Sequence, residues 1–166
     1  MADIDLEENV PDESTPEPES DLVESFITLT EQSTSFSASF LQEVTDMISA
    51  LGITLTDGDD YLLSYAAGYV EQEIKNACNV SEVPEGLYKV TVGLIVSRFL
   101  SGKRAKKQLA ADTLDFSPAL KELSEGDTKM VWDTSSGSTP EQRLDLFIGI
   151  LESGRNQFIT YRRLRW

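Results

Sequence analysis

Apolar residues recur at helical spacing in successive segments of this chain, and this spacing limits the fold more than any other feature. The first segment begins where Ser37 or Ser39 can cap a helix, and it ends at Gly52. The second covers residues 57–79, and its early acids suit a positive helix N-terminus. The two apolar stripes are Phe40, Leu41, Val44, Met47, Ile48 and Leu51, and then Leu63, Ala66, Ala67, Val70, Ile74, Ala77 and Cys78. Both segments therefore predict amphipathic helices.

Two further helices have clear start signals. Val83-Pro84-Glu85-Gly86 places a proline at a helix start, and apolar residues follow on most sides, which predicts a central helix ending at Gly102. Thr139-Pro140-Glu141-Gln142 is a capping box that opens the last helix, which runs to about Gly154. Between them, residues 120–133 alternate loosely around a Glu-Gly-Asp turn. The predicted fold is mainly α, a small bundle of about four helices with one β-hairpin or extended loop between the third and last helix.

Charge divides the chain into unequal parts. Of 29 acids and 14 bases, the first 60 residues hold 16 acids and no Lys or Arg, so the remainder is almost neutral. The last twelve residues hold four arginines, three aromatics and no acid. We expect an acidic, disordered arm over residues 1–35, a helical domain over 36–154 and a basic, aromatic docking segment over 155–166. An exposed Trp and Leu at the end would leave much apolar area in water, which favours docking on a partner.

Cysteine and histidine usage excludes several kinds of chemistry. Cys78 is the only cysteine and there is no histidine, so an intrachain disulfide, a Cys/His zinc site and a Ser-His or Cys-His catalytic pair are impossible. Cys78 lies on a predicted apolar stripe, so we assign it to packing. Asp57 and Asp59 could begin a calcium loop, but Gly68 stands where the bidentate Glu belongs. We expect no enzyme activity, no metal and no cofactor.

Signals for nucleic acid and for membranes are weak. The cations of residues 103–107 suit the solvated C-terminus of a helix better than a nucleic-acid patch. Trp132 and Trp166 could stack on bases, but such residues more often pack against protein. The sequence contains no pattern of a signal peptide or a membrane span, and the single cysteine favours a reducing cytoplasm.

Four short segments follow one another in a recognisable order. They are Ile74-Lys75-Asn76-Ala77-Cys78-Asn79, Val83-Pro84-Glu85-Gly86-Leu87, Glu125-Gly126-Asp127-Thr128 and Tyr161-Arg162-Arg163-Leu164-Arg165-Trp166. In this order, after an acidic helix start, they resemble the head-tail connector (adaptor, or head-completion) proteins of tailed bacteriophages. The resemblance spans about residues 55–166, and the acidic first 35 residues depart from it.

The resemblance implies a structural virion protein of the neck, at the head-tail interface, made in the host bacterial cytoplasm. Subunits would form a ring, expected to be a 12-mer, between the portal protein and a tail-side neck or stopper protein. DNA would pass through the ring without specific binding. Tyr161, Arg162, Arg163, Leu164, Arg165 and Trp166 would dock on the portal, and Glu125, Gly126, Asp127 and Thr128 would face the neighbouring ring or the channel.

Two alternative functions, from other classes of protein, remain. One is a small nucleic-acid-binding regulator that uses residues 103–107 and the terminal arginines. The other is a scaffold or chaperone whose acidic arm mimics nucleic acid. A connector either forms large rings or assembles on its portal, whereas a regulator binds DNA with a steep salt dependence.

Overall fold

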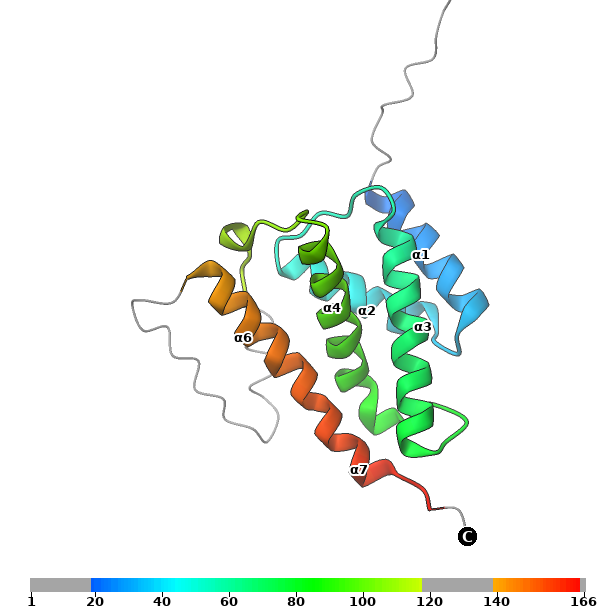
Figure 1. Cartoon of the computed structure of the whole chain (residues 1–166). Coiled ribbons are helices and arrows are strands. Elements are labelled where there is room, and N and C mark those ends of the chain that lie inside the picture. Colours follow the sequence, from blue (N-terminus) through cyan, green and yellow to red (C-terminus); the bar gives the residue numbers. More distant parts are fainter. Residues whose placement is uncertain (1–18, 118–138, 165–166) are drawn as a thin grey trace, which may run out of the picture.

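The structure, a computed structural model, describes residues 19–117 and 139–164, and most of what it describes is helical (Figure 1). The helices are α1 (Glu19–Ser33), α2 (Ala38–Ala50), α3 (Asp59–Cys78), α4 (Tyr88–Ala105), α6 (Pro140–Ser153) and α7 (Phe158–Tyr161), joined by the short 3₁₀ turns η1 (Glu85–Leu87), η2 (Ala111–Thr113) and η3 (Gly154–Gln157). The predicted mainly α bundle is confirmed. The predicted β-hairpin is not supported, because the described residues contain no strand. Residues 120–133, where the hairpin is expected, lie outside the described part of the chain.

Helix α4 is the centre of the bundle. It packs against α2, α3 and α6, and ten of its residues are buried, as its apolar character on most sides predicts. Two glycines bring its neighbours close. A Cβ at Gly93 would lie 3.2 Å from Leu151 Cδ2 of α6, and one at Gly102 would lie 3.2 Å from Leu62 Cδ2 of α3. Larger residues at these positions would push the neighbouring helices outward.

The caps that the sequence predicts set the ends of two helices. The Ser37 hydroxyl accepts a hydrogen bond from the Phe40 N–H at 3.4 Å, and Gly52, with φ +78°, follows the end of α2 in the left-handed conformation. At the start of α6, the Gln142 N–H donates to the Thr139 hydroxyl at 3.2 Å, and the Thr139 N–H donates to the Gln142 side chain at 2.9 Å. Both helices therefore begin where local sequence chemistry places them.

Residues 19–33 form helix α1 where the sequence predicts a disordered arm. Leu22 and Phe26, one helical turn apart, are 2% and 0% exposed, and α1 packs against α2 and α3. The prediction of disorder for residues 19–33 is wrong because a short apolar stripe in a polar segment cannot stabilise a helix alone, and its packing partners lie elsewhere in the chain. Helices α2 and α3 provide the surface that this stripe needs. Residues 1–18 lie outside the described part of the chain.

Polar contacts fasten α1 and the turn after it to α3. The Ser25 hydroxyl donates to Asp60 at 2.6 Å, and the Ser35 N–H donates to Glu71 at 2.9 Å. Glu71 also forms an ion pair with Lys75 at 2.8 Å. Burial alone would raise the pKa of Glu71, but the hydrogen bonds from Lys75 and Ser35 outweigh it and lower that pKa. The contribution of Glu71 to stability is thus present at neutral pH and is lost as the pH falls through the lowered pKa.

Lys103 is buried, although the sequence predicts that it belongs to a solvated cluster at a helix end. Its side chain is 3% exposed, and its ammonium group donates to Asp59 at 2.7 Å and to the Thr56 hydroxyl at 2.9 Å. Asp59 also accepts the Thr56 N–H at 2.8 Å. This network ties the C-terminal turn of α4 to the start of α3. Local sequence cannot reveal it, because the partners lie more than 40 residues apart.

We expect Asp59→Ala to lower the free energy of unfolding by about 3–5 kcal/mol, because it leaves Lys103 buried without its counter-charge. Asp145→Ala is the matched control: it removes a carboxylate from the exposed pair with Arg104 and should lower the free energy of unfolding by less than about 1 kcal/mol. Urea unfolding followed by circular dichroism measures both changes. Equal losses would contradict a buried network at Lys103.

Candidate docking site at the C-terminal end

Three of the four short sequence segments meet at the end of the bundle that carries α7, the lower end in Figure 1. Residues 74–79 form the last turn of α3 and its cap, residues 83–87 lead through η1 into α4, and residues 161–164 end α7 and follow it. Helix α7 packs against α3. We call residues 74–87 and 155–164 the terminal site, because specific contacts join them.

Hydrogen bonds to the backbone of Arg163 hold the chain after α7 against the end of α3. The Arg163 N–H donates to the Cys78 carbonyl at 2.8 Å, and the Asn79 side-chain amide donates to the Arg163 carbonyl at 3.0 Å. Asn79 has φ 55° and ψ 51°, a left-handed conformation that asparagine tolerates at the end of a helix. This residue therefore caps α3 and holds the terminal segment.

Gly86 provides the space in which the Tyr161 ring lies. A Cβ at Gly86 would stand 2.0 Å from the Tyr161 hydroxyl oxygen and 2.8 Å from Cζ, distances at which atoms must move apart. Tyr161 is half-buried and packs against the core. A side chain at position 86 would thus displace the ring of Tyr161, a residue 75 positions later in the chain.

Phe158 anchors α7 in the core beside Cys78. Phe158 is 8% exposed and Cys78 is 0% exposed, and the thiol lies 3.5 Å from the Phe158 carbonyl oxygen. Burial raises the pKa of the Cys78 thiol, which keeps it protonated and unreactive. The predicted burial of Cys78 is confirmed.

Arg155 is used within the fold, although the sequence places it in a segment for docking. Its guanidinium donates to Glu73 of α3 at 2.6 Å and 3.3 Å, and it lies 3.6 Å from Glu152. The hydrogen bond to Glu73 raises the pKa of Arg155. This arginine therefore links η3 to α3. Of the four arginines in the predicted docking segment, the docking prediction then concerns Arg162, Arg163 and Arg165.

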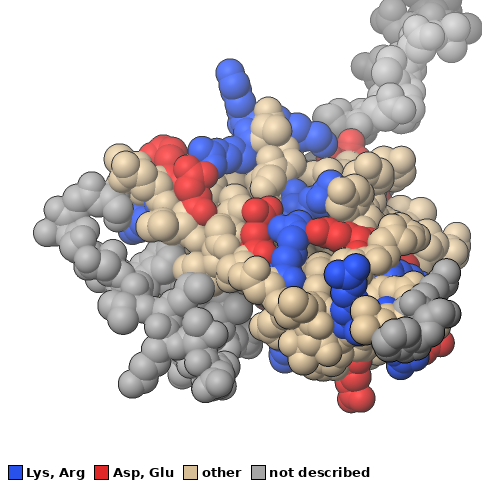
Figure 2. Space-filling model, turned by 60° about the horizontal axis from the view of Figure 1, so that its bottom comes forward, with Lys and Arg blue, Asp and Glu red and all other residues tan. Residues whose placement is uncertain are grey.

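The outer surface of the terminal site combines exposed apolar and cationic side chains. Ile159 is 78% exposed and Leu164 is 69% exposed, and Arg162 and Arg163 are also exposed. Figure 2, in which the lower end of Figure 1 faces the viewer, shows Lys and Arg side chains interspersed with Asp and Glu on this end. This surface suits a protein partner better than a phosphate backbone.

Several predicted site residues lie outside the described part of the chain. These are Glu125, Gly126, Asp127 and Thr128 of the predicted loop, and Arg165 and Trp166 of the docking segment. Within the described ranges, 19–117 and 139–164, acids and Cys78 form no cluster that could hold a metal ion, and no helix has the length and apolar character to cross a membrane.

Comparison with known proteins gives no relative for this chain. No family model, no curated protein and no solved structure matches it.

A second surface feature was missed by sequence reasoning. Tyr61, Tyr65 and Tyr69 are 71%, 61% and 45% exposed, and their spacing of four residues places them along one side of α3. Arg98 of α4 lies next to them, with its guanidinium carbon 3.3 Å from the centre of the Tyr69 ring. The spacing of four residues between these tyrosines is the sequence signal that indicates this surface.

We expect Gly86→Ala to destabilise the protein by about 1–3 kcal/mol, because the Tyr161 ring must leave its place. Hydrogen exchange of the Arg163 amide should become faster, and the destabilisation should shrink when Tyr161→Ala is added. Gly149→Ala is the matched control, since nothing lies within 4 Å of a Cβ there. Unchanged exchange at Arg163 in Gly86→Ala would contradict the role of Tyr161 in holding the segment.

Proposed function

We propose that this protein is a structural virion protein of a tailed bacteriophage, whose subunits form a ring joining the portal vertex of the capsid to the tail and continuing the DNA channel. One observation carries the proposal: three segments that resemble connector proteins in sequence meet in space and hold a terminal segment with exposed apolar and basic side chains. The expected partners are the portal protein, a tail-side neck or stopper protein, and further copies of this chain, expected to number twelve.

The terminal site has the physical properties of a docking element. Ordering a chain segment opposes binding, and the hydrogen bonds of Arg163 hold the backbone of this segment before a partner arrives. Full burial of Ile159 and Leu164 on a partner would contribute roughly 1.5–3 kcal/mol each, before any loss of side-chain freedom. Such a contact is modest alone, but repetition around a ring would make attachment effectively irreversible.

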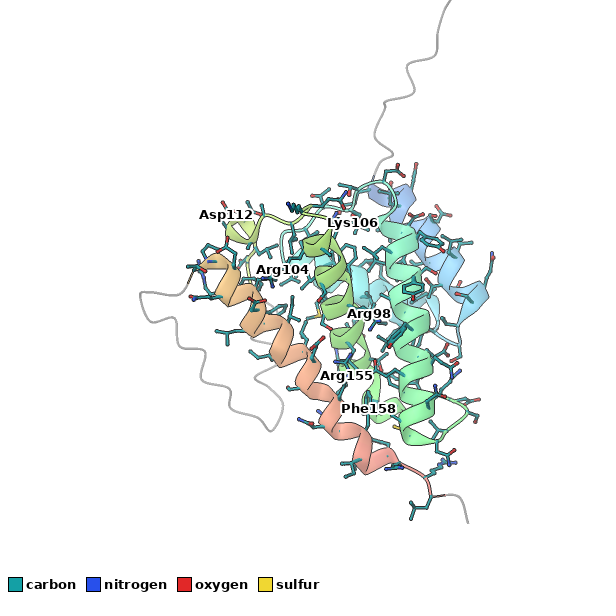
Figure 3. The ribbon with its side chains drawn as sticks, viewed as in Figure 1. Arg98, Arg104, Lys106, Asp112, Arg155 and Phe158 are labelled. Atoms are coloured by element: carbon teal, nitrogen blue, oxygen red, sulfur yellow. The ribbon has the colours of Figure 1, made fainter. Side chains whose placement is uncertain are left out.

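The distribution of cations weakens the nucleic-acid-binding alternative. Lys103 is buried against Asp59, and Arg104 pairs with Asp145, so two members of the predicted basic cluster already have acidic partners. Figure 3 shows Arg98 between Arg104 and Lys106, toward one end of the bundle, and Arg155 and Phe158, toward the other. Among the described residues, Lys103, Arg104 and Arg155 are each paired with an acid, so fewer cations are left to bind a phosphate backbone.

We expect deletion of Leu164 to Trp166 to leave the fold intact and to abolish binding to the portal ring. Leu164 is 69% exposed, so its loss removes no described core contact. Circular dichroism and co-sedimentation with purified portal rings measure the two outcomes. As a control, truncation after Gln157 also removes the buried Phe158 and should destabilise the protein. Normal portal binding by the shorter deletion would contradict the proposal.

We expect the double variant Arg162→Glu with Arg163→Glu to weaken portal binding by about tenfold or more, because it places acids opposite the acidic groups expected on a partner that binds these arginines. Lys106→Glu with Lys107→Glu is the matched control: it makes the same change in net charge at two exposed positions outside the terminal site. Titration of portal rings with each variant measures the two binding affinities and shows which variant is weakened more. Equal weakening would indicate a distributed basic surface.

A further inference from the structure

Helix α3 presents an exposed side that carries no charge. Its residues recur at spacings of three and four along the helix, and they are Tyr61, Tyr65, Tyr69, Gln72 and Asn76. The Gln72 amide donates a hydrogen bond to the Asn76 side chain at 2.9 Å, so even the two amides are turned toward each other. We call this side of α3 the tyrosine face.

Each charged side chain of α3 has a polar partner inside the subunit. The pairs are Asp59 with Lys103, Asp60 with Ser25, Glu71 with Lys75 and Glu73 with Arg155. The exposed side of the helix is therefore left to aromatic and amide groups. A surface rich in tyrosine and depleted of charge has the composition found at the centre of protein interfaces.

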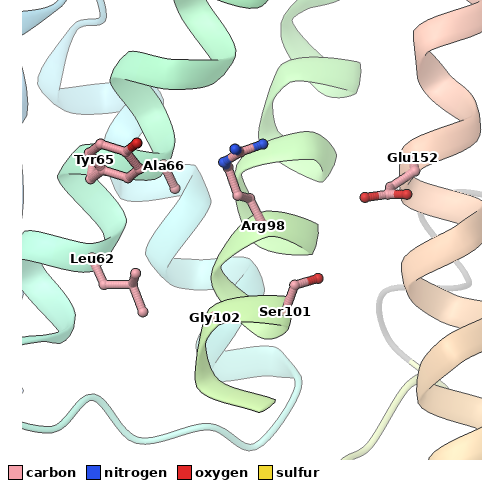
Figure 4. A pocket seen from close by; sticks show the side chains of 7 residues that line it. All are labelled: Leu62, Tyr65, Ala66, Arg98, Ser101, Gly102 and Glu152. Atoms are coloured by element: carbon pink, nitrogen blue, oxygen red, sulfur yellow. The ribbon is translucent and has the colours of Figure 1, made fainter. Parts of the chain in front are cut away.

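Helix α6 has a second uncharged side, directed away from the core. Its exposed residues, at positions i, i+4, i+7 and i+11, are Gln142, Leu146, Gly149 and Ser153. Asp145 and Glu152 lie on a different side of α6: Asp145 pairs with Arg104 of α4, and Glu152 projects into the groove between α3, α4 and α6 (Figure 4). We call the four exposed residues the α6 face.

Gly149 has no role within the subunit that would explain a glycine. It lies inside α6, and glycine is the poorest helix former after proline. Nothing lies within 4 Å of a Cβ at this position, so no contact among the described residues requires its small size. Leu146, almost one turn earlier, is 58% exposed. The glycine leaves a notch beside this leucine where a flat ring can approach the helix, as the Tyr161 ring does at Gly86.

The distribution of charge favours a second copy of this chain as the occupant. Each chain carries a net charge of −15, so two copies repel each other unless their contact avoids acids. Helices α1 and α2 hold six acids and no Lys or Arg, which makes their surfaces unsuitable for such a contact. The tyrosine face and the α6 face are free of charge and complementary in shape. Because α3 and α6 lie on either side of α4 (Figure 1), the two faces cannot meet within one subunit.

We propose that the tyrosine face of one copy packs on the α6 face of the next, with a tyrosine ring over Gly149 and against Leu146. The contact joins two different faces, so each subunit has two neighbours and repetition generates a ring or an open chain. This inference rests on the proposed function only in expecting that the chain of subunits closes into a ring.

The size of the contact predicts weak association between free subunits. The three tyrosines expose roughly 350 Å² of side-chain surface, whereas a standard interface buries about 800 Å² on each partner. We therefore expect reversible, concentration-dependent association of the free protein. A portal ring that holds many copies close together would raise their effective concentration and promote the same contact.

Sedimentation equilibrium of the full-length protein over a range of concentrations tests the contact. Gly149→Gln fills the notch with a polar side chain that suits a helix, and Tyr61→Ser with Tyr65→Ser removes two rings. Each change should raise the dissociation constant for self-association at least tenfold and leave the circular dichroism of the helices unchanged, because these positions are exposed. Ala50→Gln and Tyr88→Ser are matched controls at exposed positions outside both faces, and should not change the dissociation constant.

A mixture of the two variants shows whether the contact joins different faces. The Gly149→Gln protein keeps its tyrosine face, and the double tyrosine variant keeps its α6 face. Mixed in equal amounts, they should form a dimer with wild-type affinity and no larger species, because a single pair of intact faces remains. Wild-type protein at the same concentration should form larger species.

Three results would overturn the proposal. They are a wild-type protein that stays monomeric at all concentrations, equal association of the Gly149→Gln and wild-type proteins, and a mixture that forms no dimer. Portal binding separates this contact from the proposed function, since both variants keep the terminal site. If wild-type copies associate through these faces but do not bind portal rings, the proposed function fails and the contact stands. If both variants fill portal rings as tightly as the wild type does, the contact fails and the proposed function stands.

Discussion

Burial of α4 is the constraint on which the rest of the structure depends. A helix that is apolar on most sides must be covered on most sides, and α2, α3 and α6 provide that cover. Helix α1 covers α2 and α3 instead, and its buried residues Leu22 and Phe26 complete the core beside these two helices. Because α3 and α6 both lie against α4, the end of α3 and the chain after α6 are brought together. The terminal site is thus a consequence of how α4 is covered.

The cations of this chain have separate roles in the fold, even where they are neighbours in the sequence, as Lys103 and Arg104 are. Lys103 neutralises a buried carboxylate, Arg104 pairs with Asp145 at the surface, and Arg155 links η3 to α3. Arg98, Arg162 and Arg163 are among the described cations that form no ion pair. A basic cluster in a sequence therefore says little about a basic surface, since helix geometry sends adjacent side chains about 100° apart. Function is better sought where a cation has a fixed position and free donors.

The sequence predicts the local features of this fold and misses those that depend on distant partners. The apolar stripes of α2, α3 and α4 and the capping box at Thr139 are properties of short segments, so they could be read directly. Helix α1, the burial of Lys103 and the contact between Gly86 and Tyr161 each require a surface supplied from elsewhere in the chain. For the candidate site, the residue types were predictable, but the hydrogen bonds from Arg163 and Asn79 were not. These bonds depend on a left-handed cap at Asn79 that meets Arg163, a residue 84 positions later in the chain.

The terminal segment combines a fixed backbone with free side chains, and this combination is what a docking element requires. If the segment packed completely, as Phe158 does, it would offer a partner nothing to bury. If it were held by nothing, ordering it would oppose much of the gain from burying Ile159 and Leu164. Tyr161 against Gly86 and the Arg163 amide on the Cys78 carbonyl fix the path of the chain while Leu164 points to solvent. The contacts that stabilise the end of the fold therefore also prepare it for a partner, so a substitution at Gly86 should affect docking by displacing Tyr161 and the segment that follows it.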